Sequence, residues 1–151
     1  MHKIPIDLAI APIFSESGRE VYILSGDITG KYNIMTASWC MKVAINPQVL
    51  WAVSIKKDRF TAQLVNASKE FVIAFPKKGD SKLVEEVGSC HGDKVDKFKE
   101  YGLKVIRAKK VRVPLLMRCV GNLGVNVGEI MDCGSHYLYI GEAVEAWEAD
   151  R

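Results

Sequence analysis

The chain has 151 residues, of which 48% are hydrophobic and 26% charged, and its formal net charge is +3. These values are typical of one globular domain spanning residues 1–151 and exclude a disordered chain. The charge is small, and aromatic and basic residues do not alternate in the way that base-stacking surfaces require. The composition therefore gives no indication of a nucleic-acid partner.

The four cysteines, Cys40, Cys90, Cys119 and Cys133, lie far apart and form no CxxC pair. Their spacing therefore predicts no metal site. No apolar run approaches the roughly 20 residues needed to cross a bilayer, and the N-terminus lacks the pattern of a secretory signal. We expect a cytoplasmic protein with reduced thiols and no membrane contact.

In chain order, most apolar segments have the length and alternation of strands. The first half contains a turn at 15–18, another at Asn46-Pro47 and a charged turn at 56–59. Strands are predicted at 7–14, 21–28, 33–40, 49–55 and 70–75, the last of them stopped by Pro76. Helices are predicted at 59–67 and 81–87, with one or two helical turns at 94–101.

The second half continues the strand pattern. Weak strand signals at Val105 and 111–113 precede a long alternating pattern from Leu115 through Ile130, and a final strand at 136–144 follows the turn at 133–135. Many short strands with few short helices are typical of an antiparallel barrel and not of an alternating β-α-β chain. The fold class expected from the pattern is therefore mainly β.

The segment from Asn33 to Cys40 is the most informative part of the sequence. Apolar residues alternate with an amide, two hydroxyls and a thiol, and a large indole lies among them. One interpretation is an ordinary strand whose Thr and Ser face solvent. The other is a strand that lines a planar heteroaromatic ligand, because it offers hydrogen-bond donors and acceptors beside flat apolar surface.

The segment from Ser54 to Thr61 could bind a phosphate. It combines a serine at a strand end, cations in a turn and a threonine at the start of the next helix. A helix N-terminus supplies backbone donors, and Arg59 can bind bidentately. The alternative is a solvated charged turn.

A third polar segment runs from Ser89 to Phe98 and contains His91 and Lys94. It is interpreted either as a loop that closes over the same ligand or as a plain surface loop. The sequence contains no Gly-x-Ser-x-Gly elbow, no metalloprotease helix motif and no Walker or Rossmann glycine loop. No catalytic residue is assigned from the sequence.

The order of these motifs resembles the flavin reductase-like family. The resemblance rests on Asn33-x-Met35-Thr36-x-Ser38-Trp39, then Arg59-x-Thr61, then 70–72, 89–98 and His136 with 141–144, and it spans roughly residues 8–146. It implies an antiparallel split β-barrel that binds FMN, less often FAD, at a homodimer interface, with NAD(P)H as co-substrate. The residues that would contact the flavin are Asn33, Met35, Thr36, Ser38, Trp39, Cys40, Ser54, Lys57, Arg59, Thr61, His91 and Lys94.

The resemblance leaves several functions open. The first is a reductase that passes electrons from NAD(P)H through its flavin to free flavin, ferric complexes or a redox partner protein. The second is a flavoredoxin-like electron carrier without its own NAD(P)H oxidase activity. The third is a barrel that binds another cofactor, such as pyridoxal phosphate or haem. For Cys40, the interpretation as a packed core thiol competes with a redox role beside the flavin.

Overall fold

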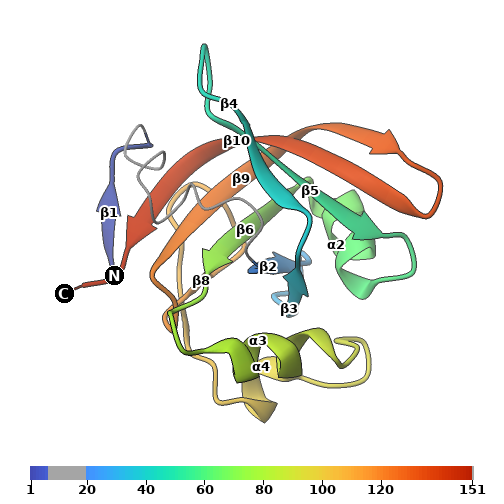
Figure 1. The fold of residues 1–151 in the computed structure, drawn as a ribbon, viewed down its shortest axis with the longest axis vertical. Coiled ribbons are helices and arrows are strands. Elements are labelled where there is room, and N and C mark those ends of the chain that lie inside the picture. The colour runs from blue at the N-terminus through green and yellow to red at the C-terminus, as the bar shows by residue number, and fades with distance from the viewer. Residues whose placement is uncertain (7–19, 151) are drawn as a thin grey trace.

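The computed structural model describes residues 1–6 and 20–150 (Figure 1). The strand predicted at 7–14 and the turn at 15–18 lie outside this part of the chain. Within the described residues, no helix is both long and apolar enough to pass through a lipid bilayer.

The described elements are mainly strands connected by short turns. The strands are β1 (His2–Ile4), β2 (Val21–Gly26), β3 (Tyr32–Ala37), β4 (Cys40–Ala44), β5 (Leu50–Lys56), β6 (Glu70–Phe75), β7 (Val105–Ile106), β8 (Leu115–Leu116), β9 (Gly121–Asp132) and β10 (His136–Glu148). The helices are α2 (Phe60–Ser68), α3 (Ser81–Gly88) and α4 (Lys97–Glu100).

The strand predicted at 70–75 coincides with β6, and the helices predicted at 59–67 and 81–87 agree with α2 and α3 to within one residue at each end. Other boundaries were wrong. The strand predicted at 21–28 ends at Gly26, because the Asp27 carboxylate accepts hydrogen bonds from the N–H groups of Thr29 and Lys31 and closes a hairpin loop. The last strand is longer than predicted and reaches Glu148.

Two further predictions need correction. The segment 33–40 is not one strand, since β3 stops at Ala37 and β4 starts at Cys40. The segment 111–113 is not a strand, because the N–H of Val111 donates to the side chain of Glu145 and not to a neighbouring strand.

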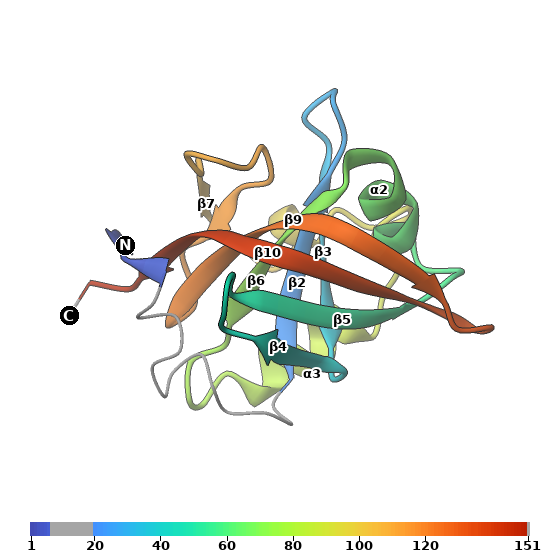
Figure 2. The same cartoon turned by 90° about the horizontal axis from the view of Figure 1, so that it is seen from above.

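The sheet closes on itself into a barrel. Its order is β3-β2-β6-β9-β10-β5-β4, with β1 paired to β10, and every pairing is antiparallel. The two ends of this order, β3 and β4, are consecutive in sequence, and only Ser38 and Trp39 separate them. These two residues, called the seam below, therefore join the two edges of the sheet. In Figure 2, β4 and β5 lie over β2 and β3, as this closure requires. The fold is the antiparallel split barrel expected from the sequence.

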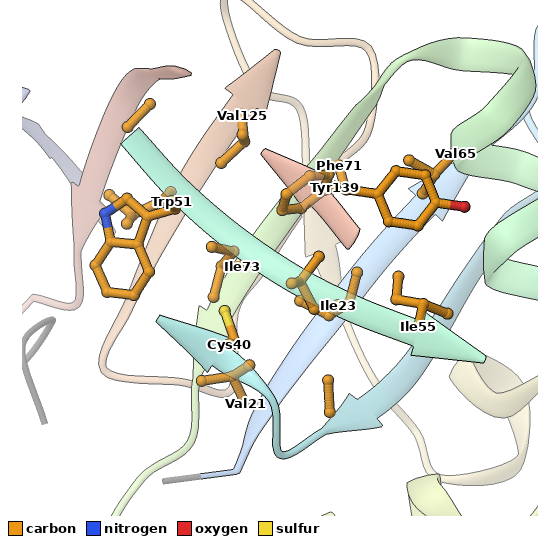
Figure 3. Packing of buried hydrophobic residues seen from close by; sticks show 14 of the residues in the cluster. Val21, Ile23, Cys40, Trp51, Ile55, Val65, Phe71, Ile73, Val125 and Tyr139 are labelled. Carbon is orange, nitrogen blue, oxygen red and sulfur yellow. The ribbon is translucent and has the colours of Figure 1, made fainter. Parts of the chain in front are cut away.

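The first core fills the barrel. Inward-facing side chains of the strands meet there, and Figure 3 shows Trp51, Ile73, Val125 and Tyr139 among them. Helix α2 contributes Ala62 and Val65 to the same cluster. The hydroxyl of Tyr139 donates to Oδ1 of Asn66 at 2.8 Å, so that helix α2 is fixed to the barrel by packing and by a hydrogen bond.

A second core lies on the outer face of β2, β3 and β6. Tyr22, Leu24 and Ile34 point to this face and pack with α3 and with residues 103–119. Figure 1 shows α3 and α4 together below β2 and β3. The central strands are consequently covered on both faces, which explains why β2 is buried at every position.

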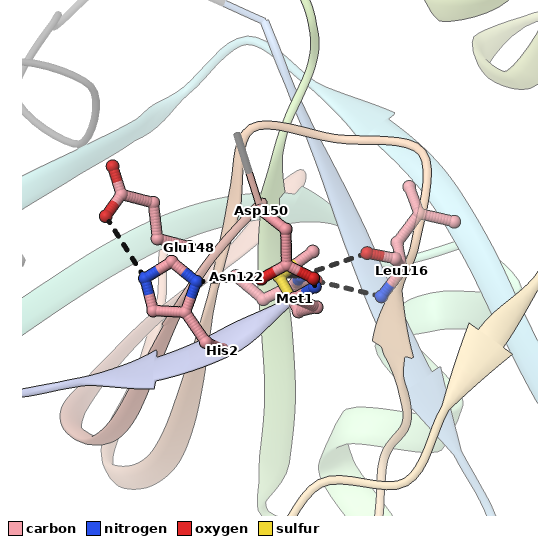
Figure 4. Close-up of polar contacts among 6 residues, drawn as sticks. All are labelled: Met1, His2, Leu116, Asn122, Glu148 and Asp150. Atoms are coloured by element: carbon pink, nitrogen blue, oxygen red, sulfur yellow. Dashed lines mark hydrogen bonds and ion pairs between the residues drawn. The ribbon is translucent and has the colours of Figure 1, made fainter.

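Asn122 on β9 holds the second core to the barrel. Its Oδ1 accepts from the N–H of Leu116 at 2.9 Å, and its Nδ2 donates to the carbonyl of Leu116 at 3.0 Å. Figure 4 shows this amide facing the Leu116 backbone, beside the contact of the Met1 ammonium and the His2 ring with Asp150. The side chain of Asn122 thus takes the place of a strand partner for β8.

Replacing Asn122 with Ala is expected to lower the free energy of unfolding by about 1–3 kcal/mol, because it leaves the buried N–H of Leu116 without a partner and its C=O with only the thiol of Cys119. Urea unfolding followed by circular dichroism measures the loss. Asn126 lies exposed on the same strand, so Asn126→Ala serves as control and should change stability by less than about 0.5 kcal/mol. Equal effects of the two substitutions would refute the role of the Asn122 amide.

Candidate functional site

The seam carries two of the predicted site residues, Ser38 and Trp39. Both side chains are exposed, and Trp39 is 64% accessible. The carbonyl of Trp39 accepts a hydrogen bond from the N–H of Ser54 at 2.9 Å, which fixes the seam to β5. The indole lies beside His136, with 5.0 Å between ring centroids and 48° between the ring planes. The seam therefore presents a flat apolar surface next to an exposed hydroxyl.

Cys40 follows the seam, but its side chain is part of the barrel core. Burial raises the pKa of the thiol to about 12, so the thiolate is not populated at neutral pH. A thiol in this state packs as a small hydrophobic side chain. The structure therefore favours the core interpretation of Cys40 over the redox one.

The N-terminus of α2 is open to an anion. Arg59 is the N-cap residue, its backbone is extended (φ −73°, ψ 140°), and its side chain makes no capping hydrogen bond. The first turn contains no acidic residue. Backbone N–H groups and the positive end of the helix dipole are thus free to act on a negative group, and the N-cap residue Arg59 itself carries a guanidinium.

Lys57 lies in the same turn but has a partner. Its Nζ is 2.6 Å from Oδ1 of Asp132 and 4.9 Å from the ring centroid of Tyr137. The hydrogen bond from Lys57 is the main reason why the pKa of Asp132 lies below its usual value. Arg59, by contrast, has no ion-pair partner among residues 1–6 and 20–150. Of these two cations, Arg59 is the one that remains free for a ligand.

Asn33 connects β3 to α2 and to the loop at 89–96. Its Nδ2 donates to Oγ1 of Thr61 at 3.0 Å, and both side chains are buried. The other side of the amide touches the loop, since a Cβ on Gly92 would lie 1.8 Å from Oδ1 of Asn33. The structure therefore brings three predicted segments together around one amide.

Met35 and Thr36 point to opposite faces of β3. Met35 packs against the barrel core, whereas the hydroxyl of Thr36 donates to the carbonyl of Val84 in α3 at 2.6 Å. The side chain of Thr36 thus ties α3 to the sheet. Only the backbone of Thr36 is therefore available for the flavin contacts that are predicted between Asn33 and the seam.

The loop at 89–96 places His91 and Lys94 at the surface, both exposed. The structure adds a residue that the sequence had not singled out, Lys97, which is only 3% exposed and donates from Nζ to the carbonyl of Val87 at 2.9 Å. Burial lowers the pKa of Lys97, the thiol of Cys90 opposes this shift, and the positive charge of Arg59 adds to it. Lys97 and Arg59 therefore lie within electrostatic reach of each other.

These residues fit a flavin mononucleotide in their donor chemistry. A phosphate needs N–H donors and positive charge, and the N-terminus of α2 with Arg59 and Lys97 supplies both. A planar ring needs apolar surface with polar groups beside it, which Ser38 and Trp39 offer at the seam. The protein groups are suited to binding and orientation, and a bound flavin would supply the redox chemistry.

Residues 14–151 match the family described as "Flavin reductase like domain". An uncharacterised protein from Archaeoglobus fulgidus is 34% identical over 132 residues, which are 87% of this chain and 73% of that protein. The chain spans 73% of the length of this relative, 63% of a relative from Pyrococcus abyssi and 49% of a relative from Aeropyrum pernix.

Solved structures give the same result. A flavoredoxin from Methanosarcina acetivorans has 27% sequence identity and a TM-score of 0.76, with 86% of this chain and 68% of that chain covered. An FMN-binding protein from Thermus thermophilus has 27% identity and a TM-score of 0.78, with 87% and 70% covered. The seam, the open N-terminus of α2 and these matches lead to one conclusion: the chain belongs to the flavin reductase-like family.

Proposed function

We propose that this protein binds FMN along the seam and acts as a reductase, taking hydride from NAD(P)H and passing electrons to free flavin, ferric complexes or a redox partner protein. Membership of the family supports flavin binding and a redox function. The observation that carries the proposal is the uncapped N-terminus of α2, with Arg59 as its N-cap residue and no acidic residue in its first turn. FAD is the less frequent alternative, and a cytoplasmic location belongs to the same proposal.

Each group has a defined role in this proposal. Arg59 and the first N–H groups of α2 hold the phosphate, and Lys97 adds positive charge from the protein interior. Asn33 keeps the helix and the loop at 89–96 in position through its bond to Thr61. Ser38 and Trp39 orient the ring, and the flavin, when bound, supplies the hydride and electron transfer.

Titration of the purified protein with FMN, followed by quenching of flavin fluorescence, tests the proposal. Stoichiometric binding and a yellow protein after desalting are the expected results. A colourless protein that takes up neither FMN nor FAD would end the proposal.

Arg59→Gln is expected to weaken FMN binding by about 10- to 100-fold, because a charge-assisted hydrogen bond to phosphate contributes about 1.5–3 kcal/mol. Riboflavin, which has no phosphate, should bind the variant and the wild type equally. Lys82 is exposed on α3, and Lys82→Gln serves as the matched control with unchanged affinities. A similar loss for FMN and riboflavin would mean that Arg59 acts on the fold and not on the phosphate.

An exposed apolar face surrounds the seam and favours a homodimer. Side chains on the outer face of four neighbouring strands lie in register, with Met41 opposite Ala52, Ala52 opposite Ile140 and, on the fourth strand, Met131 opposite Leu138. The exposed members of this face are Trp39, Met41, Val43 and Met131. Contiguous exposed apolar surface is uncommon on monomers, and we propose that a second copy of the chain covers it and encloses the ring beside Trp39.

Met41→Lys combined with Val43→Lys is expected to convert the dimer to a monomer and to weaken flavin binding, since like charges would face each other across the interface. Size-exclusion chromatography with light scattering measures the first effect. Ile28 is 88% exposed on the loop between β2 and β3, so Ile28→Lys is the control and should leave the dimer intact. A wild-type monomer that holds stoichiometric FMN would contradict the proposal.

The second candidate function is electron transport without NAD(P)H oxidase activity. The flavoredoxin among the similar structures favours it. Rapid mixing of the flavin-loaded protein with NADH or NADPH separates the two functions. Fast bleaching of the flavin supports a reductase, whereas no bleaching together with reduction by a ferredoxin-like donor supports a carrier.

A further inference from the structure

The loop at 107–112, between β7 and β8, is strongly basic and is called the basic loop below. Its cations Arg107, Lys109, Lys110 and Arg112 are exposed, whereas Ala108 and Val111 between them are buried in the second core. The four charges exceed the net charge of +3 of the whole chain. This short segment therefore carries four of the chain's 21 basic residues and no acidic residue.

The basic loop is held in one shape by a buried carboxylate. Glu145 on β10 accepts hydrogen bonds from the N–H groups of Lys109 at 3.0 Å, Lys110 at 2.5 Å and Val111 at 3.0 Å, and from Nε1 of Trp147 at 2.8 Å. These hydrogen bonds use the backbone N–H groups of the loop and leave its basic side chains exposed to solvent. A site whose backbone is already ordered loses little conformational entropy when a ligand binds.

The basic loop forms one wall of a cavity of about 540 Å³. This volume lies within the range of about 300–1,000 Å³ that is usual for small-molecule sites. Tyr32, Val105, Ile106 and Pro114 contribute aromatic and aliphatic surface, and no acidic residue lines the cavity. The ring of Tyr32 rests on the backbone of Gly26, where a Cβ would lie 2.6 Å from Cδ1 of Tyr32, and it remains 39% exposed. The cavity therefore combines a fixed ring with concentrated positive charge.

The four cations differ in their availability. Nζ of Lys109 lies 5.8 Å from the ring centroid of Trp147. Arg112 also lines a second cavity, which contains Asp27 and Glu70. Arg107 and Lys110 have no ion-pair partner in the described part of the chain, and they are the two cations most free to bind an anion.

This cavity adjoins the candidate flavin site. A neighbouring cavity of about 420 Å³ shares Tyr32 and Val105 with it and is also lined by Gly92 and Lys94. Gly92 touches Asn33, which bonds to α2. Figure 2 shows β7, the loop between β2 and β3, and α2 along one side of the barrel. A ligand in the basic cavity would thus lie on the side of the proposed flavin phosphate.

We infer that the basic cavity binds an adenosine diphosphate moiety. The phosphates contact Arg107 and Lys110, and the adenine lies against Tyr32 and Val105. This moiety is common to FAD, NADH and NADPH, and its assignment to one of these dinucleotides rests on the proposed function. An acidic protein surface could also bind to the cations of the loop, but such a partner would not require a concave site with an aromatic wall.

The test is calorimetric titration of the full chain with ADP at low ionic strength. Binding tighter than about 1 mM is expected, and Arg107→Gln combined with Lys110→Gln should weaken it at least about 10-fold. Lys78 is exposed and does not line the cavity, so Lys78→Gln is the matched control. Absence of ADP binding, or equal affinity in the double variant, would overturn the inference.

Tyr32→Ala separates the base from the phosphates. It should weaken ADP binding by about 10-fold, the effect of a lost stacking contact, and leave the binding of inorganic pyrophosphate unchanged. Equal losses for both ligands would overturn the placement of the adenine.

Displacement of bound ADP identifies the source of the moiety. Displacement by FAD assigns the cavity to the flavin dinucleotide, and displacement by NADH or NADPH in FMN-loaded protein assigns it to the nicotinamide co-substrate. Displacement by none of them would refute the assignment to a dinucleotide. FMN titration tests the proposed function separately, so failure of one proposal is distinguishable from failure of the other.

Discussion

Glu145→Gln is expected to lower the free energy of unfolding by about 3–5 kcal/mol, because an amide cannot accept all the hydrogen bonds that the carboxylate accepts and its NH2 group would face backbone donors. The side chain is fully buried and serves three backbone N–H groups and one indole. Each buried donor left without an acceptor costs about 1–3 kcal/mol, and relaxation of the loop recovers part of the sum. Denaturant unfolding measures the change.

The same carboxylate makes stability depend on pH. Burial raises the pKa of Glu145, but the N–H donors of Lys109, Trp147, Lys110 and Val111 outweigh it and hold the pKa below the ordinary value of 4.5. The unfolded chain therefore binds the proton more readily than the folded chain. The stabilisation is complete above pH 4.5 and is lost as the pH falls through the lower, folded-state pKa.

The pH dependence provides the control for this prediction. The stability difference between wild type and Glu145→Gln should be constant from pH 8 to 6 and should shrink below about pH 4.5, where the wild type also loses its charge. Glu142 lies on the same strand and makes no side-chain hydrogen bond or ion pair within residues 1–6 and 20–150, and Glu142→Gln should leave the stability at pH 7 unchanged. A stability difference that stayed constant down to pH 3 would show that the charge of Glu145 does not contribute and that only the shape of its side chain matters.

Gly92→Ala is expected to weaken FMN binding by about 10- to 100-fold, with a loss of stability of about 1–3 kcal/mol, the usual cost of overpacking. The new Cβ would lie 1.8 Å from Oδ1 and 2.5 Å from Cγ of Asn33. Either the loop at 89–96 withdraws from the site or Asn33 leaves Thr61. Both displacements disturb the N-terminus of α2, where the phosphate is proposed to bind.

A double-mutant cycle tests this cause. Asn33→Ala removes the atoms that Gly92→Ala would meet, so the double variant should bind FMN better than the two single losses together predict. Gly128→Ala is the control, since its Cβ would meet only the carbonyl of Ile140 at 3.9 Å. Additive losses in the cycle would mean that Gly92 acts through something other than contact with Asn33.

The elements that the sequence predicted correctly are those whose first and last residues are determined by residues close to them in the chain. Strand β6 ends at Phe75 because proline follows, and α2 begins after the charged turn. The open N-terminus of α2 was visible for the same reason, since a helix start and the cation at its N-cap, Arg59, are local features. The order of the motifs along the chain predicted the barrel fold.

Other features depend on residues far away in the sequence. The alternation from Asn33 to Cys40 continues without a break, so nothing local marks the seam, which arises where the two edges of the sheet meet. Val111 alternates like a strand residue but donates to Glu145, 34 positions later. Lys97 follows the N-cap Asp96 and resembles a solvated helix residue, yet its ammonium reaches the carbonyl of Val87. Asp96 was the local signal that could have placed the start of α4.

The order of strands also has a consequence for folding kinetics. In the described part of the chain, β2–β3, β4–β5, β7–β8 and β9–β10 pair consecutive strands, whereas β6 pairs with β9 and β10 pairs with β5 across long stretches of chain. Such distant pairings slow folding, because loop-closure entropy is lost before the contacts form. Since the seam joins the first and last strands of this order, it forms only when the whole sheet has closed. A cofactor bound there would lower the unfolding rate of the entire barrel and leave the early hairpins unaffected.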